Sequence, residues 1–174
     1  MKRLKEEQVP DGEGELKRRV GRALRTLRVA RGYTQQKVAD RARCHRTYLS
    51  AVEAGRRNLT AKALLALADA LQASIAELFG EPGSSARRPP SQTVALQIGA
   101  AVRTLRLRRG ISQEALGKRA RLNRSYVAGI ETGQRNPTLR NVEKLARALQ
   151  VPVAALFGCS PDQAAEATHR LSGD

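Results

Sequence analysis

The sequence predicts an all-α protein built from two similar five-helix domains joined by a linker. The first observation is an internal repeat, since a shift of 78 positions aligns residues 20–80 with residues 98–158 without a gap. Of these 61 aligned positions, 28 are identical. The second observation is that apolar residues recur every three to four positions, as on an amphipathic helix. Two copies are too few for a solenoid and indicate a tandem pair of small domains.

Composition shifts divide the chain around the two copies. The segment between them is rich in Pro, Gly and Ser, which is typical of a linker. The expected organisation is a disordered tail over 1–14, a first domain over 15–80, a linker over 81–92, a second domain over 93–158 and a tail over 159–174. That last tail has the start signal of a short helix at Ser160.

Helix signals recur in the same order in both copies. Helix 1 is marked by Val20, Leu24 and Leu27, and Gly32 is expected to end it in a left-handed conformation. The following helices have these predicted boundaries: Thr34 and Ser112 cap helix 2, helix 3 spans 46–53 and 124–131, Gly55 and Gly133 stop it, Thr60 and Thr138 cap helix 4, and a short fifth helix contains Phe79 and Phe157.

The positive charge lies in the folded copies. The chain has a formal net charge of +16, of which residues 20–80 contribute +7 and residues 98–158 contribute +9. The remaining segments sum to zero, so a basic disordered tail is a poor interpretation. A charge of this sign and size indicates nucleic acid as the first candidate partner and an anionic membrane as the second.

Several function classes find no support in the sequence. The two cysteines match no metal-ligand spacing, and the two histidines accompany no nucleophile motif or phosphate loop. We therefore expect no enzyme activity, no cofactor and no metal. No apolar run approaches the roughly 20 residues that span a bilayer. A cytoplasmic, nucleoid-associated protein of a bacterium is expected, with no membrane partner.

Two helices joined by a tight turn within a small basic domain form a helix-turn-helix arrangement. The letters "RVARGYTQQKVADRA" and "SAVEAGRRNLT", and in the second copy "RLRRGISQEALGKRA" and "AGIETGQRNPTL", resemble the phage repressor/Cro type of helix-turn-helix domain, the XRE family. The resemblance covers about 122 of the 174 residues. The first copy departs from the pattern at Ala54 and at Leu59, where proline is usual.

Helix 3 is the candidate recognition helix of each copy, because its first residues are polar and its later inward positions are apolar. Arg46 and Arg124 are the strongest candidate base readers, since an Arg fork fits the O6/N7 edge of guanine. Contact with phosphate alone stays open as the alternative. The full predicted base-reading set is His45, Arg46, Thr47 and Ser50 in the first copy and Asn123, Arg124, Ser125, Ala128 and Gly129 in the second.

The resemblance also implies phosphate contacts and two structural ion pairs. Gln35 and Gln113 open helix 2, where the family places a glutamine on a DNA phosphate. Ordinary surface polarity is the alternative for these residues and for the loop before helix 4. That loop contributes the further phosphate candidates Arg57, Asn58, Arg135 and Asn136. The implied ion pairs join Arg28 to Glu53 and Arg106 to Glu131, because a buried Glu needs a partner.

These expectations favour a sequence-specific regulator of transcription that binds a double-stranded DNA operator. One chain would act as a covalent pseudo-dimer whose heads read similar but non-identical half-sites. Alternatively, only the second copy reads DNA and the first serves dimerisation. Repression is favoured over activation, and RNA polymerase or a second copy of the chain stays open as a further partner. An antitoxin-like or anti-activator protein that binds another protein is the alternative from a different class.

Overall fold

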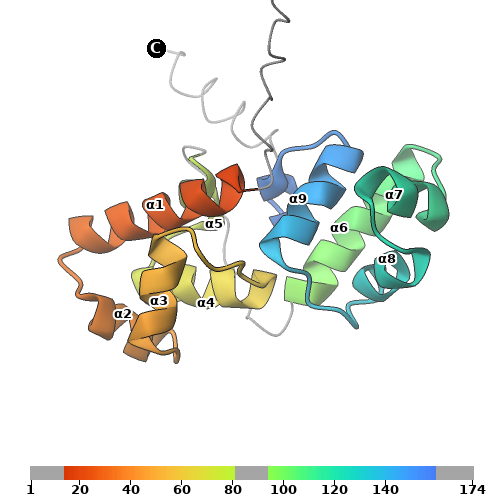
Figure 1. Ribbon diagram of the computed structural model, residues 1–174. Helices are drawn as coiled ribbons and strands as arrows, with labels where there is room; N and C mark the ends of the chain where they lie inside the picture. The colour runs from red at the N-terminus through yellow and green to blue at the C-terminus, as the bar shows by residue number, and fades with distance from the viewer. Residues whose placement is uncertain (1–13, 81–93, 160–174) are drawn as a thin grey trace, which may run out of the picture.

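The computed structural model describes residues 14–80 and 94–159 and shows two clusters of helices side by side (Figure 1). The expected linker, the tail before Gly14 and the short helix from Ser160 lie outside the described residues. The first copy consists of α1 (Glu15–Ala30), α2 (Gln35–Arg41), α3 (Arg46–Glu53), α4 (Ala61–Leu71) and α5 (Ile75–Phe79). The second consists of α6 (Val94–Arg108), α7 (Gln113–Ala120), α8 (Arg124–Glu131), α9 (Leu139–Ala148) and a 3-10 helix, η2 (Val153–Phe157).

The predicted helix signals are confirmed. The side chains of Thr34, Ser112, Thr60 and Thr138 each accept a backbone N–H from the first turn of the helix that follows, and so replace a bond the helix itself cannot make. After α1, Gly32 has a φ of +65°, in the left-handed region that favours glycine. The all-α fold class therefore follows from local signals that both copies share.

The last helix differs between the copies, which the sequence did not predict. In α5 the Ser74 side chain accepts the N–H of Glu77 and the Glu77 side chain accepts the N–H of Ser74, a complete capping box. The second copy has Pro152 and Ala155 at these positions and no side-chain cap. There the segment is a 3-10 helix rather than an α-helix.

Helix 1 packs closely against the end of the recognition helix in each copy. A Cβ atom added to Gly21 would collide with the carbonyl oxygen of Val52, and one added to Gly99 would collide with that of Ile130. Glycine is therefore required at both positions by the approach of two backbones. The fully buried Leu24 and Leu49 lie in the core that these helices enclose.

The two copies are joined along a seam, which we define as the contacts that α4, α5 and the loop before α4 make with the second copy, and the contacts that α9, η2 and the loop before α9 make with the first. Helix α1 contacts α9, α4 contacts α6, and α5 contacts η2. Because α1 is equivalent to α6 and α4 to α9, the first two contacts are the same contact made in opposite directions. The Phe79 and Phe157 rings, which occupy equivalent positions, lie 5.8 Å apart between centroids. The copies are therefore related by an approximate two-fold axis through the seam.

Backbone hydrogen bonds cross the seam reciprocally. The amide of Ala61 donates to the carbonyl of Pro137 at 2.9 Å, and the amide of Leu139 donates to the carbonyl of Leu59 at 2.6 Å. Only the carbonyls of residues 59 and 137 take part, so proline, which lacks an N–H, fits one copy and leucine the other. Thr60 and Thr138 form an isolated antiparallel bridge at the same place.

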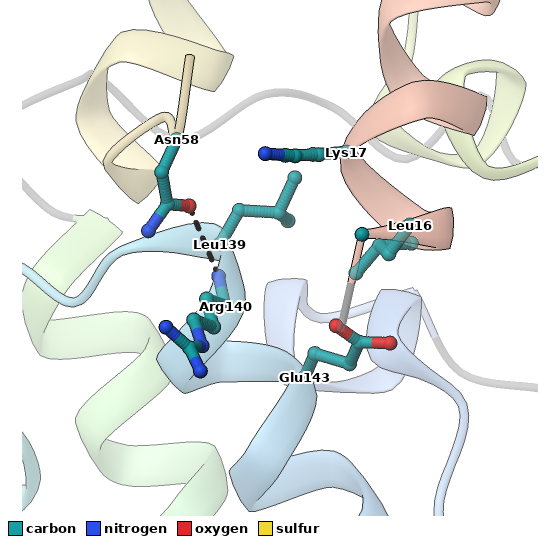
Figure 2. A pocket seen from close by; sticks show the side chains of 7 residues that line it. Leu16, Lys17, Asn58, Leu139, Arg140 and Glu143 are labelled. Carbon is teal, nitrogen blue, oxygen red and sulfur yellow. Dashed lines mark hydrogen bonds between the residues drawn. The ribbon is translucent and has the colours of Figure 1, made fainter. Parts of the chain in front are cut away.

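Two asparagine side chains extend this pairing. The Oδ1 atom of Asn136 accepts the N–H of Lys62, and the Oδ1 atom of Asn58 accepts the N–H of Arg140, both at 3.3 Å. Figure 2 shows Asn58 reaching across the seam to the start of α9. A cavity of about 300 Å³ lies beside this bond, lined by Gly14, Leu16, Lys17, Asn58, Leu139, Arg140 and Glu143.

Candidate nucleic-acid interface

The recognition helices present their polar first residues to solvent. In α3, His45, Arg46 and Thr47 are exposed, whereas Leu49 and Val52 are buried in the core. Helix α8 has the same pattern at its start, where Asn123, Arg124 and Ser125 are exposed. One turn later, Ser50 in α3 is half-buried, and so are Ala128 and Gly129 in α8. The structure thus brings the predicted base-reading residues together on one accessible turn and a half of each helix. Their contact with bases stays a prediction.

The two recognition helices begin differently. The Oδ1 atom of Asn123 accepts the N–H of Tyr126 at 2.6 Å and caps α8. His45 occupies the equivalent position and makes no side-chain cap. The first turn of α8 is therefore held by a side chain, and the first turn of α3 is not.

A buried ion pair holds each recognition helix against helix 1. In the first copy, Arg28 donates to both oxygens of Glu53, at 2.6 Å from Nε and 2.9 Å from Nη2. The same guanidinium donates to the carbonyl of Tyr33 at 2.9 Å. This fork anchors the C-terminal end of α3 and the loop after α1 with one side chain.

The second copy repeats this arrangement at greater depth. Arg106 donates to the two oxygens of Glu131 at 2.6 Å and 3.0 Å, and to the carbonyl of Ile111 at 2.8 Å. The side chains of Arg106 and Glu131 are 9% and 0% exposed, against 12% and 4% for Arg28 and Glu53. Both ion pairs implied by the family resemblance are thus present in the structure.

Electrostatics keeps both glutamates ionised. Burial acts to raise the pKa of Glu53, but the hydrogen bonds from Arg28 and Gln35 outweigh it and leave that pKa below its usual value. Glu131 shows the same balance, with burial opposed by hydrogen bonds from Arg106 and Gln113, and its pKa is likewise lowered. The pKa of each arginine is raised, chiefly by the hydrogen bond to its glutamate.

The first residue of helix 2 has a partner that the sequence did not predict. Gln35 Nε2 donates to Glu53 at 3.0 Å, and Gln113 Nε2 donates to Glu131 at 2.9 Å. Each glutamine thus connects the start of helix 2 to the ion pair. An amide group has two N–H donors, so a phosphate contact stays a prediction for the second one.

The four loop candidates divide into two kinds. Arg57 and Arg135 are exposed, and their phosphate contacts stay predictions. Asn58 and Asn136 are exposed as well, but their Oδ1 atoms hold the seam. Sequence reasoning missed this role, although one signal pointed to it: the Asn is kept in both copies while the residue after it changes.

These features define the class of the protein. Two helix-turn-helix units, each with an exposed polar turn on its recognition helix, lie within a chain of net charge +16. No group of three metal-ligating side chains occurs in residues 14–80 and 94–159. Within the same ranges, every helix is too short or too polar to cross a bilayer. The fold and the site are those of a helix-turn-helix DNA-binding protein.

Comparison with known proteins gives the family. Residues 19–78 match the family described as "Helix-turn-helix domain", and residues 102–156 match the family described as "Helix-turn-helix". The control protein C.BamHI of Bacillus amyloliquefaciens is 40% identical over 62 residues, which are 35% of this chain and 76% of that protein. The chain therefore belongs to the phage repressor/Cro-type, or XRE, helix-turn-helix family, and it contains two domains of this kind.

Other relatives are named as regulators. The immunity repressor protein of Bacillus phage phi105 is 36% identical over 63 residues, which are 36% of this chain and 44% of the repressor. The chain thus spans less than half the length of that relative. The solved structure of the restriction-modification controller protein C.AhdI from Aeromonas hydrophila has 46% sequence identity, covers 36% of this chain and 96% of its own, and has a TM-score of 0.36.

Proposed function

We propose that this chain is a sequence-specific regulator of transcription that binds double-stranded DNA with both heads at once. The observation that supports this most strongly is the reciprocal seam, in which Ala61 and Leu139 exchange backbone hydrogen bonds with the opposite copy. An approximate two-fold axis in the protein matches the two-fold axis of paired half-sites in DNA. One chain would then do the work of a dimer.

The two heads are proposed to read similar but non-identical half-sites about 34 Å apart, one helical turn of DNA. Arg46 and Arg124 are equivalent and would make the shared contact, a bidentate bond to guanine. His45 and Asn123 differ at the start of the helices, and the residues one turn later differ as well. These differences would make the two heads prefer different bases at the other positions of their half-sites. Linkage of the two heads in one chain also makes the binding of the second head intramolecular, which raises its effective concentration at its half-site.

Repression is the proposed sign of regulation. A protein covering an operator excludes polymerase by its volume alone and needs no additional domain. The 36% identity with a protein named immunity repressor supports this choice. A transcription assay on a promoter that contains the selected site tests it, and increased transcript would show activation instead.

Selection of bound sequences from random duplex DNA, with the full chain, tests the function. We expect one split motif with unequal halves. Arg46→Ala should remove preference at base pairs in one half, and Arg124→Ala at base pairs in the other. Loss at the same base pairs, or no effect of Arg46→Ala, would show that the heads do not divide the site.

Salt dependence separates DNA binding from the protein-binding alternative. Binding through phosphates releases counterions, so the affinity should fall steeply as salt rises, with a log–log slope of about −0.9 per phosphate contacted. A chain with no affinity for duplex DNA at low salt would instead belong to the antitoxin-like or anti-activator class.

A further inference from the structure

The loop after the recognition helix follows a different path in the two copies. In the second copy, the amide of Arg135 donates to the carbonyl of Gly129 in α8 at 3.0 Å. In the first copy, the bond to the equivalent carbonyl, that of Ala51, comes from Arg56 at 2.8 Å. The position equivalent to Arg135 is Arg57, one residue further along. The hydrogen bonding in the second copy is therefore shifted by one residue and brings Arg135 onto its helix.

The glycine in α8 makes room for this arginine. A Cβ atom added to Gly129 would lie 2.8 Å from Cγ of Arg135, closer than Cβ atoms approach neighbouring carbons in proteins. The stem of Arg135 thus lies directly on the backbone of α8. The first copy has Ala51 at the equivalent position, and its methyl group occupies the space that such a stem needs. Arg57 cannot take the same course without displacing that methyl group.

The two arginines line hollows that involve different neighbouring helices. Arg135 lines a hollow on the side of α8 that faces the start of α7, together with Arg124 and Gln113. Arg57 lines a hollow on the side of α3 that faces α4, together with Tyr48 and Thr60. Arg135 therefore shares a hollow with Arg124, the residue proposed to read guanine, whereas the hollow that Arg57 lines does not include Arg46.

We propose that Arg135 reads a base within the second copy's half-site, that Gly129 positions it to do so, and that the first copy has no equivalent contact. This inference rests on the proposed DNA-binding function. Arg124 on the first turn of α8 and Arg135 in the loop after α8 present two exposed guanidinium groups, and the O6 and N7 atoms of guanine are paired acceptors that fit such a fork. The placement also gives a reason for a glycine inside a helix, where alanine would be the more stable choice.

The test uses the full chain and the duplex selected from random DNA, with every base pair of both half-sites substituted in turn and each affinity measured by competition. Arg135→Lys keeps the charge but loses the fork, and Gly129→Ala displaces the arginine. Each should lower discrimination by about tenfold, at the same base pair of the second copy's half-site. Because both changes act through one contact, the double variant should lose no more than Arg135→Lys alone.

Matched changes in the first copy provide the control. Ala51→Gly should leave discrimination unchanged at every base pair of both half-sites, and any loss of affinity in Arg57→Lys, a candidate phosphate contact, should be equal for all sequences. Arg135→Ala, which removes the charge as well as the fork, completes the set. Circular dichroism melts check that all five single variants are folded, and Arg135→Lys, which alters only an exposed side chain, keeps the test decisive should Gly129→Ala unfold.

Three results would overturn the inference. Unchanged discrimination in Arg135→Lys would show that Arg135 supplies charge alone. A uniform loss of affinity for all sequences in Arg135→Ala, with a smaller salt slope, would place it on a phosphate. A wild-type chain without any sequence preference would instead overturn the proposed function, and this inference with it.

Discussion

The two copies of the domain share their internal framework and differ on their outer faces. The ion pair, the glycine at the crossing of helix 1 and the seam bonds recur at equivalent positions with nearly equal distances. By contrast, the cap of the recognition helix and the loop behind it differ. Residues that maintain backbone approaches and buried charges are constrained by the fold, whereas residues on an exposed helix turn are free to follow the ligand.

The largest expected effect tests the shared framework. Glu53→Gln and Glu131→Gln should each lower the free energy of unfolding by about 3–5 kcal/mol, because the arginine left behind is a largely buried charge that has lost its counter-ion. Urea titration followed by circular dichroism measures this. The second change should have at least as large an effect as the first, since its pair is less exposed.

An exposed ion pair provides the control for that comparison. Lys118 and Glu114 lie 2.9 Å apart on the surface of α7. Glu114→Gln should leave the melting temperature unchanged, because solvent screens exposed pairs. A Glu131→Gln variant as stable as Glu114→Gln would show that the buried pair contributes nothing to stability.

Acid should lower the stability of both copies over the same pH range. The folded-state pKa of Glu53 and of Glu131 lies below 4.5, so the unfolded chain binds more protons as the pH approaches that value. The stabilisation by these carboxylates is complete above pH 4.5 and is lost as the pH falls through their lower folded-state pKa. Melting temperatures between pH 7 and pH 3 measure this loss. Each single Gln variant should show a flatter profile than the unchanged chain, and an identical profile would contradict the assignment.

The seam offers a comparison in which the copies should respond equally. Asn58→Ala and Asn136→Ala each remove one hydrogen bond across the seam, and together they should cost about 1–3 kcal/mol. The two single variants should agree within error, because the bonds are reciprocal and of equal length. Unfolding in urea measures the cost, and strongly unequal effects would show that the seam is asymmetric in solution.

The smallest effect concerns the start of the recognition helices, where the copies should respond in opposite directions. Asn123→Ala removes a cap and should cost about 1 kcal/mol, whereas His45→Asn adds one and should stabilise the chain by up to about 1 kcal/mol. Thermal melts at pH 7 measure both. A destabilising His45→Asn would mean that His45 has a role that capping does not describe.

The sequence predicted the elements of this fold well because their signals are local. Thr34 and Thr60 cap helices that begin one residue later, and the apolar positions of α1 repeat within a single helix. The pairing of Arg28 with Glu53 came from the family resemblance, and the structure adds the third member, Gln35. Helices α3 and α8 begin where the sequence predicted, and the role of their first turns in reading bases stays a prediction.

The features that the sequence did not predict join residues far apart in the chain. Asn58 was assigned to a loop facing DNA, yet its side chain also bonds the amide of Arg140, 82 positions away. No periodicity or cap signal reports such a contact. The 3-10 form of η2 is an exception, because the difference that accompanies it is local: Pro152 and Ala155 replace Ser74 and Glu77, which form the capping box of α5.

By itself, the sequence determined that this chain contains two repressor-like helix-turn-helix domains, since caps, helix periods and a repeat are written along the chain in order. Only the tertiary structure decided how the copies meet and that the stem of Arg135 lies on α8. Both depend on close approach: the amide of Leu139 to the carbonyl of Leu59, and the stem of Arg135 to the bare backbone of Gly129. Such approaches are set by the positions of whole helices, and a single side chain then decides whether the space is open.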